Sequence, residues 1–174
     1  KVNILGGKPV VRFDGTNDQL RRVSDAALNA IVLPITFIAV TANGTNPLGL
    51  YDGAPGAAGT FRFYNANAVE IQNADPSIAL TLVSAGSIVV VTAAIVAAAR
   101  TLTAYRNGVQ QSTGTGTNTD MTTTNPTIGT INTGSDGAFN GDVAEIMLIN
   151  RVLNAGERNA IERYLGRKWG IAVS

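Results

Sequence analysis

The chain has 174 residues, of which 45% are hydrophobic and 14% are charged, and its formal net charge is +1. This length suits one domain with a sizeable core, and the apolar content excludes a disordered chain, while the charge balance excludes the basic surface of proteins that bind nucleic acid or anionic membranes. The lack of cysteine and histidine excludes disulfides, thiolate nucleophiles and the commonest general base.

Short apolar runs separated by turn residues fill the first half of the chain, as expected for strands. Residues 9–15 alternate like a strand and end at the turn signal of Asp14 and Gly15. Residues 33–41 predict a second strand, with Pro34 at its start, where the missing N–H costs little. Further strands are expected at 48–52, 61–64, 68–72, 77–83 and 88–95. The alanines at 93–99 also suit a helix, but we prefer a strand followed by a tight turn near 97–99.

The second half continues the same pattern. Asn107 and Gly108 form the strongest short hairpin signal, and they separate a strand at 102–106 from its partner at 109–112. Residues 113–125 are rich in Thr, Gly and Asn and predict an exposed loop or edge. Residues 127–131 predict a short strand. Residues 142–149 form a long apolar run, which predicts a central strand covered on both faces.

The end of the chain changes to a helical period. Asn154 stands three residues before Glu157, as in a capping box, and Gly170 supplies a C-cap. A helix at about 155–168 is therefore predicted, with its apolar stripe on the rest of the domain. The residues that recur at helical spacing are Ile161, Tyr164, Leu165, Lys168 and Trp169. The aromatic residues expected in the core or under the helix are Phe13, Phe37, Phe139, Tyr164 and Trp169.

About a dozen short strands followed by one helix predict an all-β fold, a two-sheet antiparallel β-sandwich with one C-terminal α-helix packed on it. Residues 1–174 are expected to form a single domain. The longest apolar run, 88–99, is shorter than the roughly twenty residues that cross a membrane, so no membrane partner is predicted. The basic pairs, Arg21 with Arg22 and Arg167 with Lys168, are expected at the solvated surface.

Five blocks of the sequence resemble laminin-G-like domains of bacterial and phage proteins, in the order of that family and over nearly the whole chain. The blocks are 11–20 (VRFDGTNDQL), 35–40 (ITFIAV), 102–109 (LTAYRNGV), 139–154 (FNGDVAEIMLINRVLN) and 157–171. The resemblance implies a concanavalin A-like jelly roll. By analogy it also implies glycan binding, adhesion or virion architecture, at a virion or an extracellular or cell surface.

The acidic residues argue against catalysis. Glucanases with related sandwiches carry Glu-x-Asp-x-x-Glu or Glu-x-Asp-x-Glu on one strand, where alternate residues share a face and bring an acid and a nucleophile together. This chain has four glutamates, Glu70, Glu145, Glu157 and Glu162, and none belongs to such a pattern. No Gly-x-Ser-x-Gly motif occurs either. We therefore predict a protein that is not an enzyme, with a sandwich hydrolase or lyase as the weakest alternative.

A structural calcium at the sandwich rim is implied by the resemblance, and no other cofactor is predicted. Calcium prefers six to eight oxygen ligands, so carboxylates near loops are the candidates. Asp14 and Asp142 are the best pair. Relatives carry an Asp on the closing strand where this sequence has Ala144, which weakens the case. The alternative is that both acids accept local hydrogen bonds in turns.

We predict a non-catalytic recognition or surface-display module that binds a glycan. Such a site needs a cleft with aromatic and amide side chains. The candidate ligand-binding residues are Tyr51, Tyr64, Asn65, Asn67 and Tyr105. The alternative is a structural virion protein, a capsid decoration or fibre domain, whose partners are neighbouring subunits and which forms homo-oligomers. The sequence does not decide between the two.

Overall fold

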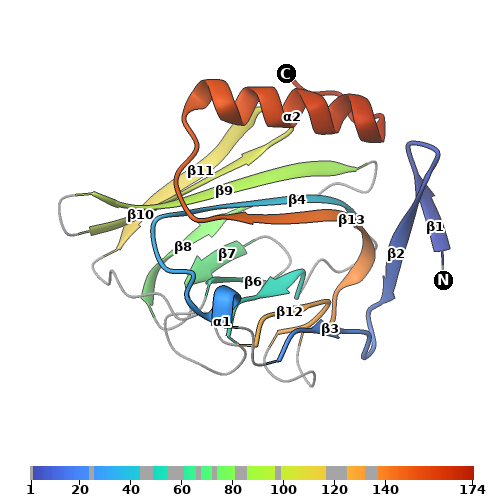
Figure 1. The fold of residues 1–174 in the computed structure, drawn as a ribbon, viewed down its shortest axis with the longest axis horizontal. Coiled ribbons are helices and arrows are strands. Elements are labelled where there is room, and N and C mark those ends of the chain that lie inside the picture. Colours follow the sequence, from blue (N-terminus) through green and yellow to red (C-terminus); the bar gives the residue numbers. More distant parts are fainter. Residues whose placement is uncertain are drawn as a thin grey trace.

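Two antiparallel sheets pack face to face in the computed structural model, and one helix covers the outside of one sheet (Figure 1). The structure describes residues 2–23, 26–43, 49–54, 61–65, 68–71, 74–80, 86–96, 99–116, 125–131 and 137–174. Every strand pairing within this part of the chain is antiparallel. The predicted fold class, an all-β two-sheet sandwich with a C-terminal helix, is therefore confirmed.

Counted over the described residues, the larger sheet has seven strands and the smaller has six. In spatial order the larger contains β1 (Val2–Leu5), β2 (Lys8–Asp14), β13 (Asn140–Ile149), β4 (Ile35–Asn43), β9 (Ser87–Val96), β10 (Ala99–Arg106) and β11 (Val109–Gly116). The smaller contains β3 (Leu20–Arg21), β12 (Thr127–Ile128), β5 (Tyr51–Asp52), β6 (Phe61–Asn65), β7 (Ala68–Ile71) and β8 (Ala74–Ala79). The helices are α1 (Ala26–Asn29) and α2 (Ala155–Trp169). Among the described residues no helix is both long and apolar enough to span a bilayer.

The middle strands of the larger sheet are buried on both faces. In β4, Phe37 and Ala39 face the smaller sheet, while Ile38 and Val40 face α2. A strand covered on both sides needs apolar residues at every position rather than at alternate ones. This explains why β4 and β9 are almost continuously hydrophobic in the sequence.

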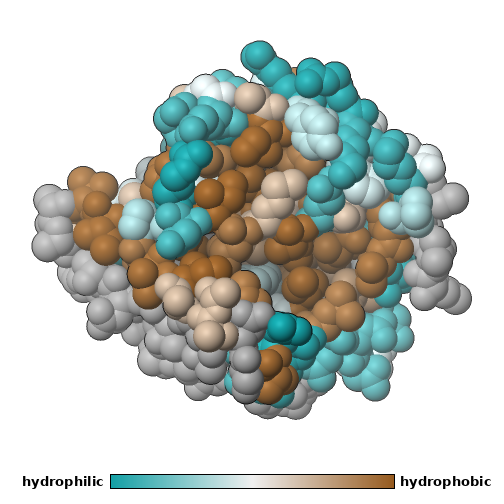
Figure 2. All heavy atoms as spheres, in the orientation of Figure 1, coloured by the Kyte–Doolittle hydropathy of each residue, from teal (hydrophilic) through white to brown (hydrophobic). Residues whose placement is uncertain are grey.

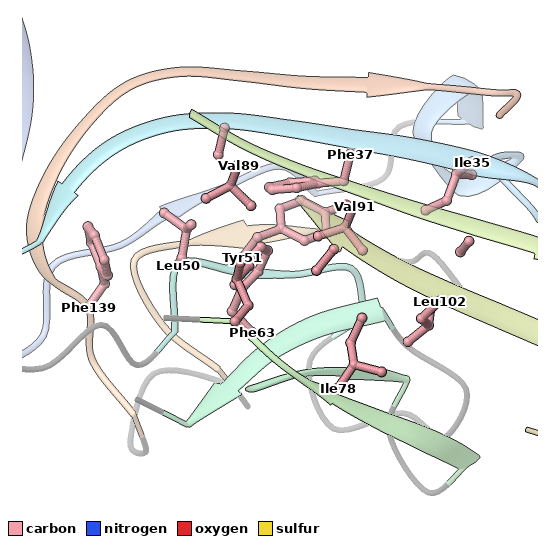
Figure 3. Packing of buried hydrophobic residues seen from close by; sticks show 14 of the residues in the cluster. Ile35, Phe37, Leu50, Tyr51, Phe63, Ile78, Val89, Val91, Leu102 and Phe139 are labelled. Atoms are coloured by element: carbon pink, nitrogen blue, oxygen red, sulfur yellow. The ribbon is translucent and has the colours of Figure 1, made fainter. Parts of the chain in front are cut away.

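Aromatic rings hold the two sheets together. The Phe37 ring lies 5.0 Å from the Tyr51 ring and 5.2 Å from the Phe63 ring, measured between centroids. Figure 3 shows Tyr51 and Phe63, from the smaller sheet, pointing toward Phe37 and Val91 of the larger one. Phe13 and Phe139 meet edge to face at another end of the same core. The predicted core positions of Phe13, Phe37 and Phe139 are thus confirmed.

The predicted hairpin at Asn107 and Gly108 joins β10 to β11. Their φ angles of 52° and 88° are those of a turn with two left-handed residues, which matches the twist of the flanking strands.

β11 continues to Gly116, so the first part of the predicted loop or edge at 113–125 is an edge strand. Residues 117–124 lie outside the described part. Ala99 of β10 pairs with Val96 of β9, and the turn predicted near 97–99 falls on residues 97–98, which are not described.

Helix α2 begins and ends where its capping signals predict. The Glu157 N–H donates to Asn154 Oδ1 at 3.0 Å, the Asn154 N–H donates to Glu157 Oε2 at 3.0 Å, and Gly170 is left-handed. Leu165 and Trp169 are buried against the outer face of the larger sheet. The prediction for Tyr164 is wrong, because its side chain is 53% exposed. Successive helical residues are rotated by about 100°, so the neighbour of Leu165 points to the side.

Other boundaries differ from the predicted ones. The structure adds β1, β3 and α1, which the sequence pattern does not predict, because each is too short to show a period. The predicted strand at 127–131 is two residues long, since Gly129 has a φ of 96° and breaks it. The strand expected at 77–83 is β8, which begins at Ala74 and ends at Ala79, and 81–85 are not described. The strand expected at 48–52 is β5, and residue 48 is not described.

Candidate functional site

The sandwich is closed along one side and open along the other. On the closed side β11 lies against β8, and Ser112 Oγ donates to the Ala79 carbonyl at 2.5 Å. On the open side a cleft of about 390 Å³ lies between β3 and β12 of the smaller sheet and β13 of the larger. The cleft explains why Ile146 and Leu148 of β13, a strand predicted to be covered on both faces, are only partly buried.

The walls of the cleft are mostly aliphatic. Leu20, Ile128 and Tyr51 form a row, because they stand opposite one another across β3, β12 and β5. The facing wall is the inner face of β13, where Ile146 and Leu148 rest on the core. The full described lining is Leu20, Arg21, Arg22, Leu28, Tyr51, Pro126, Ile128, Ile146 and Leu148. Figure 2 shows a group of hydrophobic residues below α2, where the surface of the molecule is hollowed. This is the side on which β13 and β3 lie in Figure 1.

Two arginines give the cleft its charge. Arg21 and Arg22 are exposed and line it from β3 and the residue that follows. The Arg22 N–H donates to the Pro126 carbonyl at 3.1 Å, which fixes the backbone of this rim. None of the described lining residues is an Asp or a Glu. The charged side chains of the described lining are therefore both positive, which favours an anionic ligand.

Tyr51, a predicted ligand residue, lines the cleft but is only 5% exposed. Burial is the main cause that raises the pKa of its phenol, and the negative charge of Asp52 adds to the effect. The hydroxyl is therefore neutral at physiological pH. Because the ring packs on Phe37, it forms an inner wall of the cleft rather than an open stacking platform.

Of the other predicted ligand residues, the structure describes only the side chain of Tyr105, and it does not lie near Tyr51. Tyr105 lies on the opposite face of the larger sheet, beside the cluster under α2, with the Arg158 guanidinium 3.7 Å from its ring centroid. The backbones of Tyr64 and Asn65 belong to β6, and nothing is described of their side chains. Asn67 lies outside the described residues.

The two candidate calcium ligands stand on neighbouring strands with separate partners. Asp142 is 5% exposed, and its two carboxylate oxygens accept hydrogen bonds from Arg12, with 2.7 Å between Nη2 and Oδ2. Asp14 Oδ1 accepts the Thr16 N–H at 2.8 Å, as in a turn. No group of three or more Asp or Glu side chains converges among the residues described. A calcium ion at Asp142 would lie beside the Arg12 cation. The turn role expected as the alternative fits Asp14, whereas Asp142 forms an ion pair between β2 and β13 instead.

Three of the four glutamates hold α2 in place. Glu145, on β13, accepts a hydrogen bond from Trp169 Nε1 and pairs with Lys168 Nζ at 2.8 Å. Glu157 caps the helix, and Arg151 beside it holds the pKa of this carboxyl below its usual value. Glu162 is fully buried and accepts the Gly108 N–H at 2.9 Å. The side chain of Glu70, in β7, is not described.

Most of the cleft residues are absent from the sequence prediction. Arg21 and Arg22 are exposed, as expected of a solvated basic pair, but they also line the cleft. Ile146 and Leu148 belong to a run that reads as fully covered, and no local signal separates a covered apolar face from an open one. In the sequence, an aliphatic residue, Leu20, stands directly before the basic pair, and this is a hint of an apolar site beside a positive charge. The structure confirms that Leu20 is 52% exposed.

Comparison with known proteins gives a family and a fold. A model of the concanavalin A-like lectin/glucanases superfamily matches residues 24–157. A search of curated protein sequences returns no match. Forty solved chains are similar in structure, and three of them illustrate the range.

The CBM40 domain of Ruminococcus gnavus IT-sialidase, bound to α2,3-sialyllactose, has a TM-score of 0.65 at 15% identity, over 89% of this chain and 97% of that one. Domain 4 of a GH43 extracellular arabinanase from Geobacillus stearothermophilus, with arabinotriose, has 0.62 at 11%, over 90% and 79%. Trypanosoma rangeli sialidase with sialic acid has 0.61 at 16%, over 99% of this chain but 30% of that one. At these identities the likeness shows the fold alone.

Proposed function

The chain belongs to the concanavalin A-like lectin/glucanases superfamily, and on that premise we propose that it is a non-catalytic module that binds a glycan in the cleft between β3 and β13. The cleft itself carries this proposal. Its volume of about 390 Å³ lies within the range of roughly 300–1,000 Å³ found for small-ligand sites. Domains of the same fold bind sialyllactose and arabinotriose, which supports a sugar as the ligand.

The positions of the glutamates support a non-catalytic role. A glycosidase needs two carboxyl groups on either side of the bond that is cleaved. In this chain Glu145, Glu157 and Glu162 are bound to the helix or its neighbours, on the side of the larger sheet away from the cleft. The polar side chains in the described lining of the cleft are two arginines and a neutral phenol, where a glycosidase would have its two carboxyl groups.

A test uses two exposed aliphatic residues in strands. Leu20, at the cleft, is 52% exposed, and Val96, at the end of β9, is 58% exposed. Calorimetric titration with α2,3-sialyllactose, arabinotriose and a wider glycan panel should detect binding that Leu20→Asp abolishes and Val96→Asp retains. If every glycan fails to bind, or if Leu20→Asp leaves binding intact, glycan recognition in this cleft is refuted.

We place the module at an extracellular or virion surface. The alternative is a capsid decoration or fibre domain that acts through contacts between subunits, and the exposure of Ile95 and Val96 at the end of β9 supports it. Consecutive strand residues point to opposite faces, so β9 exposes one apolar side chain on each face at this end, where a neighbouring subunit would bury them. Sedimentation of the full chain separates the two, because a glycan module is expected as a monomer and a virion part as a symmetric oligomer.

A calcium site at Asp14 and Asp142 stays a prediction. The ion would compete with Arg12 for the Asp142 carboxylate. Melting with calcium and then with a chelator tests it, since an ion that binds only the folded state raises the melting temperature. A difference that Asp142→Asn removes would establish the site, and identical melting curves would eliminate it.

A further inference from the structure

The cleft offers few groups that match a neutral sugar. Among its described lining side chains, the hydrogen-bonding groups are the two guanidiniums and the Tyr51 phenol, and the rest are hydrocarbon. A neutral sugar carries hydroxyls around its ring, and each one buried without a partner costs about 1–3 kcal/mol. A ligand that fits these walls therefore has an apolar part.

The arginines add a second requirement. Arg21 and Arg22 supply donors in a planar fork and no acceptor, which matches a carboxylate rather than a hydroxyl. They lie at one rim, on the β3 side, whereas Ile146 and Leu148 form the opposite wall. The charge is thus confined to one side of the cleft, whereas hydrocarbon lines both sides.

We propose that the cleft binds an amphiphilic carboxylate, whose acidic group pairs with Arg21 and Arg22 and whose apolar group lies on Ile128, Ile146 and Leu148. This deepens the proposed function and rests on the same cleft. Two kinds of ligand combine a carboxylate with an apolar group. One is an acidic sugar that carries an acyl substituent, as part of a surface glycan, and the other is a free medium-chain fatty acid. The experiment has an arm for each.

The first arm is a chain-length series on the full chain. Burying one methylene contributes about 0.8 kcal/mol, which is about fourfold in affinity. Butanoate, hexanoate and octanoate should therefore bind with dissociation constants that fall about fourfold per methylene until the cleft is filled. Hexanol and hexylammonium, with the same chain and a neutral or positive head, should bind at least tenfold more weakly than hexanoate.

The second arm uses sugars. N-acetylmuramic acid carries a carboxylate and an acyl group, and N-acetylglucosamine is its neutral counterpart. If a glycan is the source, the acid should bind at least tenfold more tightly than the neutral sugar. If a fatty acid is the source, octanoate binds and neither sugar does, and the glycan proposal then fails while the amphiphilic carboxylate stands.

Paired variants locate the carboxylate. Arg21→Gln with Arg22→Gln should weaken the tightest acidic probe at least tenfold and leave hexanol unchanged. The matched control is Arg163→Gln with Arg167→Gln, two exposed arginines on α2, which should change nothing. A neutral glycan that binds the cleft regardless of Arg21 and Arg22 would overturn this inference and leave the proposed function standing. Equal affinity for all three head groups, or no gain with chain length, would also overturn it.

Discussion

Glu162 shows how one residue joins three parts of the molecule. Its carboxylate lies under α2, pairs with Arg158 Nε at 3.3 Å and accepts the N–H of Gly108 at the tip of the β10–β11 hairpin. The Arg158 guanidinium in turn covers the Tyr105 ring. The C-terminal tail meets the same hairpin, because the Ser174 N–H donates to the Asn107 carbonyl at 3.0 Å. Glu162 is thus a structural residue.

The buried position of Glu162 predicts a pH dependence of stability. Burial raises the pKa of its carboxyl above the ordinary value of 4.5, against the opposing effects of Gly108 and Arg158. The folded state then holds this proton more tightly than the unfolded chain. The resulting stability is complete below pH 4.5 and is lost as the pH rises through the folded-state pKa.

Glu162→Gln cannot titrate and isolates this contribution. Denaturant unfolding of both proteins between about pH 3 and pH 8 should show the wild type losing stability relative to the variant as pH rises. A wild type whose stability stays constant or rises relative to the variant as pH increases would show that burial does not control this group.

At the scale of elements, α2 is the part that local sequence signals predict best. Its capping box and its C-cap involve residues within one turn of each end, so no distant contact is needed to recognise them. β13 is the opposite case. Its apolar run predicts a strand, but whether Ile146 and Leu148 are covered depends on how β3 and β12 are placed. The cleft is therefore a tertiary property, and of the two predicted ligand residues whose side chains the structure describes, Tyr51 lines it and Tyr105 does not.

Adjacent residues of α2 test its apolar stripe. Leu165 is fully buried, so Leu165→Ala should lower the free energy of unfolding by about 2–5 kcal/mol. Tyr164 is 53% exposed, so Tyr164→Ala should change it by about 0.5 kcal/mol or less. Denaturant melts measure both, and comparable losses for the two variants would mean that the helix is rotated.

A pair of glycines tests the packing of the short strands on the core. Gly129, after β12, has a φ of +96°, and an added Cβ would lie 2.3 Å from the Phe13 ring. Gly7, with a φ of +75°, has no heavy atom within 4 Å of an added Cβ. Both alanine variants carry a backbone cost of about 1–2 kcal/mol, and Gly129→Ala adds overpacking of about 1–3 kcal/mol. Equal thermal stabilities would show that Phe13 does not pack against this turn.

At the scale of the whole molecule, the two sides of the sandwich differ. β8 and β11 close one side, and the seven-stranded sheet extends past the six-stranded one at the other, where the cleft opens. The helix covers the middle of the outer face of the larger sheet, so β4 and most of β9 are buried on both sides, whereas β2 and β11 have exposed residues such as Val11 and Val109. The sandwich thus covers its core along the β8–β11 side and leaves an apolar cleft, lined by two arginines, along the other side.

The central claim is that this cleft binds a glycan, and methyl NMR tests it most directly. The full chain, labelled at Ile and Leu methyls, is titrated with α2,3-sialyllactose, arabinotriose and N-acetylmuramic acid. The account predicts that at least one sugar saturably shifts Leu20, Leu28, Ile128, Ile146 and Leu148 and leaves Ile38 and Leu165, beneath α2, unchanged. Shifts confined to the methyls beneath α2, or none with any sugar, would contradict it.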